Sequence, residues 1–378
     1  MIGRRPLLAT AAAAVLPVWS AAARTPGDAR LAVILLRGGL DATSLLPPVD
    51  EWEIRRRRPR IAAADAEGAL PLPGSPRPLH RAMPTLQSLV SRSEALVLAG
   101  GALPGDAVSH LAAQRILEEG SDEGDGSGWL GRAARLLGAA PAGPTAPRLL
   151  QDGPTPRILP VRAWPEIDPT LAADLRSLWQ TDPDLGRGFR DDLDALPPEN
   201  RSTAGDLWRA RGRLGPGAAA LGAEALGRAL AQDARLGVLE IGGFDTHRAQ
   251  ARRLPERLAA LDAVLAGLRA HLGRAWDRTL VLVLPEFGRR LDETGYGGTE
   301  HARATAAIVA GGAAAGGRVE APTIGRPGPD DGILPVFDLR LLARAALREH
   351  LGLPDPEIER RILPRLGAVG RVRGIVRG

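Results

Sequence analysis

The segment 31–41 reads LAVILLRGGLD, a continuous apolar run that ends in a glycine turn and an aspartate. Six apolar residues without an intervening polar residue are typical of a strand that is buried on both faces of a parallel sheet. The glycines let the backbone turn sharply where such a strand ends. This stretch therefore predicts the first strand of an α/β sheet, with Asp41 just beyond its carboxyl end.

The same pattern recurs along the chain of 378 residues, which is long enough for one large α/β domain. Further apolar runs predict strands at residues 95–99, 236–241, 279–284 and 304–310. Helical spacing predicts helices at residues 107–119, 219–234, 255–272 and 339–351. Strands that alternate with helices predict a doubly wound, mostly parallel sheet with helices on both faces.

Periodicity breaks down between residues 120 and 217, a segment rich in proline that also holds several tryptophans. A bare loop of this length is uncommon in a compact domain. We interpret the segment as an inserted helical cap that covers the site, within a single α/β domain at residues 24–378.

The amino terminus resembles an export signal. Arg4 and Arg5 precede an apolar run at residues 9–19, and the small residues SAAA follow at 20–23. This order is typical of a cleavable signal of the twin-arginine type, and the run is too short to span a membrane. We expect residues 1–23 to be removed, the twin-arginine machinery to export the chain, and the mature protein to be periplasmic or secreted without a membrane span. The alternative is an uncleaved, alanine-rich first helix.

Composition excludes several classes of site. The chain has no cysteine, so a disulfide framework, a zinc–thiolate site and a thiol nucleophile are excluded. Its basic residues are all arginine, 49 against 44 acidic residues, without a long basic run. Aromatic residues make up only 3% of the chain, too few for a base-stacking surface. We therefore expect no nucleic-acid partner.

Acidic and imidazole residues gather at the predicted strand ends. In open α/β sheets, ligands bind beyond the carboxyl ends of the strands. The residues found there or just before the fifth strand are Asp41, Ser109-His110, Asp245-Thr246-His247, Glu286 with Arg289, and Glu300-His301. Carboxylates brought together in one crevice repel one another unless a cation neutralises them, and imidazole adds affinity for Zn, Mn or Fe. The pattern therefore predicts a divalent metal site.

Each residue also has a simpler local explanation. Asp41 is well placed to cap the following helix, and His110 to pack or cap at a helix start. Asp245 is suited to an Asx-turn, and Glu286 to a surface ion pair with Arg289. Glu300-His301 is also compatible with an ordinary turn. What favours a shared site is the recurrence at successive strand ends, which no single local explanation covers.

The ordered motifs RGGxD, SH, GGxDTH, EFGR and GTEH resemble an exported bacterial family of unknown function, DUF1501, in the alkaline phosphatase and sulfatase superfamily. The resemblance covers roughly residues 31–353. It implies an alkaline phosphatase-like fold and a metal-dependent hydrolase of phosphate or sulfate esters, with one or two divalent ions (Zn, Mn, Mg, Ca or Fe). The substrate would be an anionic ester, with a cell-envelope polymer as one option. The alternative is a noncatalytic exported binding or assembly protein that retains the fold.

The resemblance also implies roles for individual residues. Asp41 takes the place of the first-strand metal ligand, Asp245 and His247 match the ligands of one ion, Glu286 stands at the other ion, and His301 matches the late histidine. The catalytic residues would be Ser109 near the nucleophile position with His110 beside it, and Arg289 or Arg37 as a clamp for the anion. The chain departs from the superfamily pattern where Phe287, rather than histidine, follows Glu286, and where alanine follows Asp41 and His301.

Overall fold

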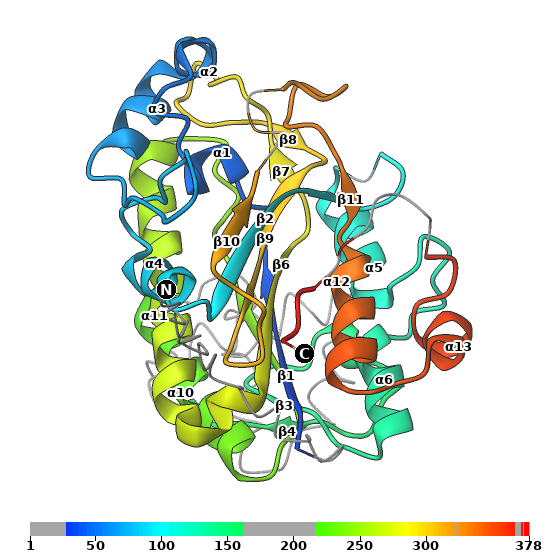
Figure 1. Cartoon of the computed structure of the whole chain (residues 1–378). Coiled ribbons are helices and arrows are strands. Elements are labelled where there is room, and N and C mark those ends of the chain that lie inside the picture. The colour runs from blue at the N-terminus through cyan, green and yellow to red at the C-terminus, as the bar shows by residue number, and fades with distance from the viewer. Residues whose placement is uncertain are drawn as a thin grey trace, which may run out of the picture.

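The structure is a computed structural model that describes residues 28–106, 108–161, 216–321, 324, 326–366, 372 and 374–377. Its centre is a nine-stranded sheet in the order β10-β2-β9-β6-β1-β5-β3-β4, with β11 beside β2 (Figure 1). The strands are β1 (Arg30–Leu36), β2 (Ala95–Ala102), β3 (Ala142–Gly143), β4 (Arg157–Ile158), β5 (Leu236–Ile241), β6 (Thr279–Pro285), β9 (Thr305–Ala310), β10 (Arg318–Glu320) and β11 (Phe337–Asp338). All five strands predicted from the sequence belong to this sheet.

Helices cover both faces of the sheet, as expected (Figure 1). On one side lie α4 (Pro84–Ser91), α10 (Pro216–Gln232) and α11 (Gln250–Leu272), and on the other lie α5 (His110–Glu119), α6 (Trp129–Leu137) and α12 (Arg340–Ala345). The shorter helices are α1 (Ala42–Leu45), α2 (Trp52–Arg57), α3 (Pro59–Ala66) and α13 (Asp355–Glu357). Short 3-10 turns span Arg148–Leu150 and Gly273–Arg278, and π-helical turns span Ala346–His350 and Ile358–Ile362. The fold class predicted from the sequence is confirmed.

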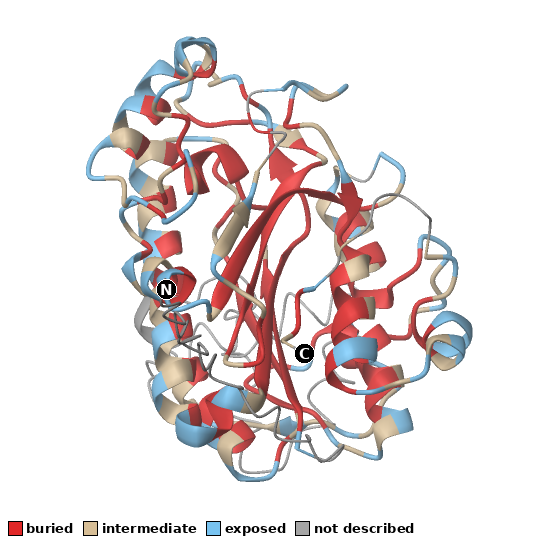
Figure 2. Cartoon of the chain, viewed as in Figure 1, coloured by how far each residue is buried: buried red, intermediate tan, exposed pale blue. Residues whose placement is uncertain are grey.

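Strand β1 shows why the apolar run predicted a strand that is buried on both faces. Ala32, Ile34 and Leu36 belong to the core under α4, α10 and α11. The alternate residues Leu31, Val33 and Leu35 belong to the second core, under α5, α6 and α12. Figure 2 shows the central strands buried throughout. Since successive side chains of a strand point to opposite faces, only an unbroken apolar run fills both cores.

The direction of β9 differs from that of its neighbours. It runs antiparallel to β2 and β6, whereas the other described pairings in this sheet are parallel. The start of β9 therefore lies at the edge where β6 and β1 end. The small hairpin of β7 (Gly288–Arg289) and β8 (His301–Ala302) sits there, with Arg289 opposite His301. The residues before β9 thus reach the same edge as the residues after β5 and β6.

Part of the predicted cap segment belongs to the central fold. Helix α6 packs in the second core, and β3 and β4 extend the sheet beyond β5. Residues 162–215 lie outside the described residues, so the cap stays a prediction. The predicted signal at residues 1–23 also lies outside the described residues. Within the described part of the chain, no helix is long and apolar enough to cross a membrane.

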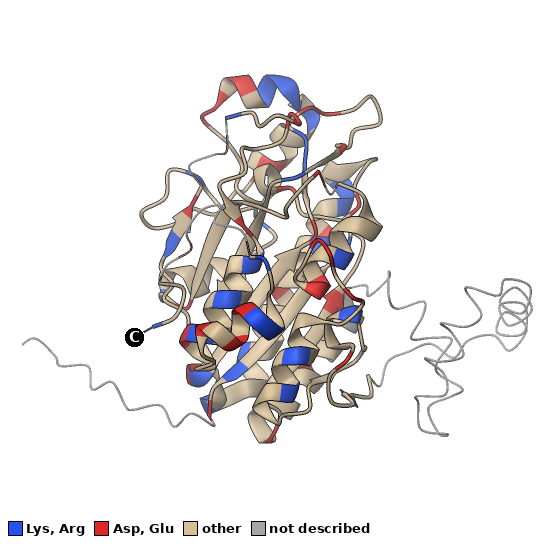
Figure 3. Cartoon of the chain, turned by 90° about the vertical axis from the view of Figure 1, so that its right-hand side faces the viewer, with Lys and Arg blue, Asp and Glu red and all other residues tan. Residues whose placement is uncertain are grey.

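Charged side chains are interspersed over the molecule. On the face shown in Figure 3, acidic and basic residues alternate along the helices and do not form a continuous stripe of one sign. This arrangement accords with a chain whose net charge is only +5. The expectation of no nucleic-acid partner stays a prediction.

Asp65 on α3 should make the stability of the fold depend on pH. Burial raises the pKa of this carboxyl to about 7, and its charged or polar neighbours are Ser44, Asp41, Arg58, Arg81 and His80. The folded state then holds this proton more tightly than the unfolded chain, so the free energy of unfolding should fall as pH rises from about 4 to about 7. Urea unfolding should show that Asp65→Asn loses less stability than the wild type over this interval. An unchanged pH profile in the variant would contradict the prediction.

Candidate metal centre

Four side chains from three loops converge beyond the carboxyl end of β5. Asp245 and His247 follow β5, His110 is the first residue of α5, and His301 begins β8. Asp245 Oδ1 lies 3.1 Å from Nε2 of both His247 and His301, and these two nitrogens are 2.9 Å apart. Nε2 of His110 lies 3.6 Å from Asp245 Oδ2. Three imidazole nitrogens thus surround one carboxylate.

The opposite ring nitrogen of each imidazole is held by an oxygen of the chain. The Nδ1 partners are Glu286 Oε1 at 2.6 Å for His110, the Val108 carbonyl oxygen at 2.8 Å for His301, and Glu300 Oε2 at 3.1 Å for His247. Histidines that bind metal ions have their second nitrogen fixed in this way by a carboxylate or backbone carbonyl. When a metal ion binds, a neutral imidazole with its proton on Nδ1 would present its Nε2 lone pair to the ion, and these contacts favour that tautomer.

His110, Asp245 and His301 each place one ligand atom within 4.8 Å of the other two, as a single metal ion needs, and His247 adds a contact to Asp245 and His301. Tetrahedral coordination at the usual Zn–N and Zn–O distances separates neighbouring ligand atoms by about 3.3 Å. The contacts among the three Nε2 atoms and the two oxygens of Asp245 span 2.9–3.6 Å. The side chains of His110, His247 and Asp245 remain 34–42% exposed, so water can reach the outward side of such an ion.

The local charge also fits one divalent cation. With neutral imidazoles, the carboxylates of Asp245, Glu286 and Glu300 and the guanidinium of Arg289 leave a net formal charge of minus two. One divalent cation balances this charge, and a second would leave an excess. In the metal-free protein, Asp245 and Glu286 raise the pKa of His110 to about 9, so a proton on this imidazole partly offsets the carboxylates.

Arg289 fixes the loop that carries Asp245. Its guanidinium is fully buried and donates to Asp245 Oδ1 at 2.7 Å and to the carbonyl oxygens of Gly38, Phe244 and Thr299. Burial by itself raises the pKa of Asp245, but hydrogen bonds from His110, His301 and Arg289 outweigh it and hold this pKa far below its usual range. Arg289 therefore supports the site from below, since its donors are bound to the chain, and it is not positioned as the predicted clamp for an anion.

Gly38 shows why the first strand must end in glycine. Its φ is +105°, and a Cβ atom there would lie 2.3 Å from the backbone nitrogen of Asp245. Its N–H donates to Glu286 Oε1 at 2.9 Å. The turn after β1 thus packs directly against the loop after β5, which a larger residue would displace.

Glu286 is deeply buried at the site, with 1% of its side chain exposed. Oε1 accepts from His110 and Gly38, whereas Oε2 is buried without a hydrogen-bond partner in the described part of the chain. The sequence predicted Glu286 as a metal ligand. The structure brings it to the cluster as the partner of His110 Nδ1, one layer behind the converging Nε2 atoms.

Asp41 and Ser109 have other roles in the structure than those predicted. Asp41 caps α1 by accepting from the N–H groups of Thr43 and Ser44, and its Oδ2 accepts from Arg58 at 2.8 Å. With 2% exposure, this carboxylate is occupied by the helix cap and the ion pair, and it is not part of the cluster. Ser109 is exposed, and its hydroxyl caps α5 by accepting from the Ala112 N–H at 3.3 Å.

Two further predicted assignments change. His110, predicted as a catalytic residue, belongs geometrically with the potential ligands. Arg37 forms ion pairs with Glu118 at 2.7 Å and Glu240 at 2.5 Å, which leaves its guanidinium committed to the protein.

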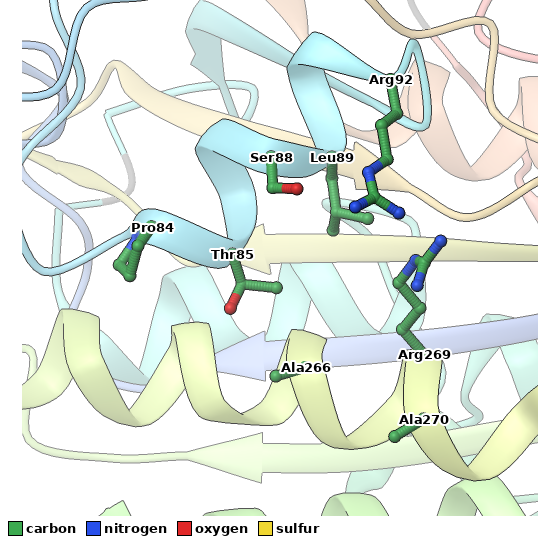
Figure 4. A pocket seen from close by; sticks show the side chains of 8 residues that line it. All are labelled: Pro84, Thr85, Ser88, Leu89, Arg92, Ala266, Arg269 and Ala270. Atoms are coloured by element: carbon green, nitrogen blue, oxygen red, sulfur yellow. The ribbon is translucent and has the colours of Figure 1, made fainter.

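A separate hollow of about 400 Å³ lies between α4 and α11 (Figure 4). Its lining includes Thr85, Ser88, Arg92 and Arg269, and Arg269 pairs with Glu94. None of its lining residues belongs to the cluster, and it offers no imidazole or carboxylate ligand. The candidate site is therefore the cluster at the sheet edge.

Fold and cluster together define an α/β protein with a potential metal centre at the carboxyl end of its sheet. The family model described as "Protein of unknown function (DUF1501)" matches residues 203–325, which confirms the resemblance to this family over that segment. The matched segment includes Asp245, His247, Glu286, Arg289 and His301. No curated protein matches the chain.

Among solved structures, the chain is similar to a phosphonate monoester hydrolase of Agrobacterium radiobacter. The sequence identity is 14% and the TM-score is 0.37, with 92% of this chain and 79% of that chain covered.

Glu286→Gln tests the support of His110. The amide keeps the shape but carries no charge, so we expect the affinity for Zn²⁺ to fall about tenfold or more while binding persists. Glu240→Gln is the matched control, because Glu240 is a buried carboxylate on β5 that pairs with Arg37. Titration calorimetry should show a loss for the first variant and none for the second. Equal affinities for Zn²⁺ in both variants and the wild type would show that Glu286 does not support metal binding through His110.

Proposed function

We propose that this chain is an exported metal-dependent hydrolase of phosphate or sulfate esters that works with one divalent cation. The observation that carries the proposal is the convergence of three imidazole Nε2 atoms on Asp245, with all three Nδ1 atoms held by oxygens. His110, Asp245, His247 and His301 would hold the cation. Imidazole-rich sites of this kind suit Zn, Mn or Fe better than Mg or Ca.

The ester substrate rests on the resemblance of the motifs to the alkaline phosphatase and sulfatase superfamily. When bound, a divalent cation supplies Lewis-acid chemistry that polarises an ester oxygen and makes water more acidic. In the hydrolysis, the oxygen of water bonds to phosphorus or sulfur. The bond from phosphorus or sulfur to the alcohol oxygen breaks, and the alcohol leaves with one proton of the water.

The chain's own residues would prepare this site in three ways. Glu286 and Glu300 orient His110 and His247 through their Nδ1 atoms. Arg289 keeps Asp245 ionised. Phe287 packs against the ring of His301, with centroids 4.3 Å apart, and so shields one side of the cluster from water.

The position of Ser109 bears on how water enters the reaction. Its hydroxyl is exposed and caps α5, where it accepts from the Ala112 N–H at 3.3 Å. We therefore infer direct attack by water, without a covalent intermediate on serine.

The local bonding of Ser109 and Arg289 favours a second candidate, a noncatalytic exported binding or assembly protein with a structural metal ion. In the described part of the chain, the Ser109 hydroxyl serves as a helix cap and the Arg289 guanidinium is bonded to Asp245 and to carbonyl oxygens.

The test measures metal content and turnover together on the purified full chain. Elemental analysis should find about one divalent ion per chain. Generic aryl phosphate and sulfate esters should be hydrolysed, with the activity lost on chelation and restored by the same metal. His247→Ala is the control and should lack both metal and activity. Metal without turnover of either ester class would favour the binding protein, and a wild type without metal would overturn both candidates.

A further inference from the structure

Gln250 joins the two loops that carry most of the cluster. It is the first residue of α11 and is fully buried. Its side-chain oxygen accepts from the Thr246 hydroxyl at 2.8 Å and from the Thr299 hydroxyl at 2.7 Å. Thr246 lies between Asp245 and His247, and Thr299 lies two residues before His301. One amide oxygen is therefore bonded to both metal-bearing loops.

The opposite end of the same amide is fixed by Asp41. Gln250 Nε2 donates to Asp41 Oδ2 at 2.6 Å and to the Ser44 hydroxyl at 3.1 Å. Because a carboxylate accepts hydrogen bonds only, Asp41 determines which way the amide faces. Arg58 holds Asp41 in turn at 2.8 Å.

Backbone contacts bring the same two loops together. The Gln250 N–H donates to the Gly297 carbonyl oxygen at 2.8 Å, and the Thr299 N–H donates to the Thr246 carbonyl oxygen at 3.2 Å. At Gly298 an added Cβ atom would lie 2.1 Å from the carbonyl carbon of His247. The loops therefore touch directly, and Gln250 lies at their junction.

We propose that Gln250 is a positioning residue of the metal centre, which sets the separation between the Asp245–His247 pair and His301. Asp41 acts through Gln250 and orients its amide. This inference rests on the proposed metal centre. It accounts for an aspartate after β1 whose carboxylate is otherwise unavailable to a metal ion.

The test uses variants that remove one hydrogen bond at a time and preserve shape. Thr246→Val and Thr299→Val each delete one donor to Gln250, and Gln250→Met deletes the amide. Thr279→Val is the matched control, because Thr279 is fully buried and its hydroxyl donates to the Ala275 carbonyl oxygen at 2.7 Å. It lies at the start of β6, at the opposite edge of the sheet.

Affinity for Zn²⁺ is measured by competition with a chromophoric chelator, and stability by urea unfolding of the metal-free protein. We expect the two threonine variants to bind about tenfold more weakly, as for other groups that orient metal ligands. Thr279→Val should lose comparable stability and keep its affinity. In the metal-free protein, the ¹⁵N signals of His247 and His301 should move in Thr246→Val, Thr299→Val and Gln250→Met but not in Thr279→Val. If Gln250→Met does not fold, the threonine variants still decide the outcome.

Two results overturn the inference in distinguishable ways. Wild-type binding of Zn²⁺ together with unchanged affinity in Thr246→Val and Thr299→Val would reject the role of Gln250 and leave the metal centre intact. A wild type that binds neither Zn²⁺ nor Mn²⁺ would reject the metal centre and the inference together.

Discussion

Asp245→Ala should abolish metal binding and also destabilise the metal-free protein. The carboxylate is the common neighbour of His110, His247 and His301. In the described part of the chain, it is also the one carboxylate bonded to the buried guanidinium of Arg289, at 2.7 Å. Its removal leaves a buried charged donor short of its partner, at an expected loss of about 1 to 3 kcal/mol in the free energy of unfolding. The remaining bonds of Arg289 to three carbonyl oxygens keep the loss within this range.

His247→Ala separates the two effects of this variant. His247 is one-third exposed, and its contacts are with Asp245, His301 and Glu300. We therefore expect it to lose the metal ion with a smaller change in the stability of the metal-free protein. Elemental analysis and urea unfolding on both variants check the pair of expectations. Retention of one ion per chain by Asp245→Ala would contradict the assignment of the site.

The sequence predicted the sheet well because a strand that is buried on both faces is an unbroken run of apolar residues. Runs such as residues 31–36 and 280–284 contain no polar residue, and they coincide with β1 and β6 within one residue at each end. The start of α11 was missed: Pro255 suggested a helix beginning there, whereas the helix begins at Gln250. The side chain of Gln250 is bonded to two segments distant in sequence, at Asp41–Ser44 and at Thr299, and such bonds carry no local periodicity.

Within the candidate site, the sequence identified most of the side chains that meet but not which of them stand in front and which behind. Asp245, His247 and His301 meet as expected, because β9 runs antiparallel and brings the residues before it to the edge where β5 ends. His110 faces Asp245 with Nε2, whereas Glu286 lies behind it and holds its Nδ1. The spacing of the motifs does not indicate which of the two side chains lies nearer to Asp245. Asp41 lies at a strand end, where the sequence predicted a metal ligand. In the structure its carboxylate instead caps the next helix and pairs with Arg58.

Arg58→Ala should lower the free energy of unfolding by about 3 to 5 kcal/mol, because it breaks a buried ion pair from one side. The Arg58 side chain has no exposed area, and neither partner of its bond to Asp41 is more than 1% exposed. Its other donors bind the carbonyl oxygens of Leu291 and Arg290 at 2.9 and 2.7 Å, which ties α3 to the loop after β7. The variant leaves Asp41 buried without its cation.

Arg228→Ala on α10 is the control for an exposed ion pair. Arg228 pairs with Glu224, with side chains 63% and 35% exposed, and exposed ion pairs contribute about 0 to 1 kcal/mol. Urea unfolding of the two variants should therefore differ by at least about 2 kcal/mol, with Arg58→Ala the less stable. Equal stabilities would mean that water or a neighbouring group compensates Asp41. In that case the chain of contacts from Arg58 through Asp41 to Gln250 would not be rigid enough to orient the metal centre.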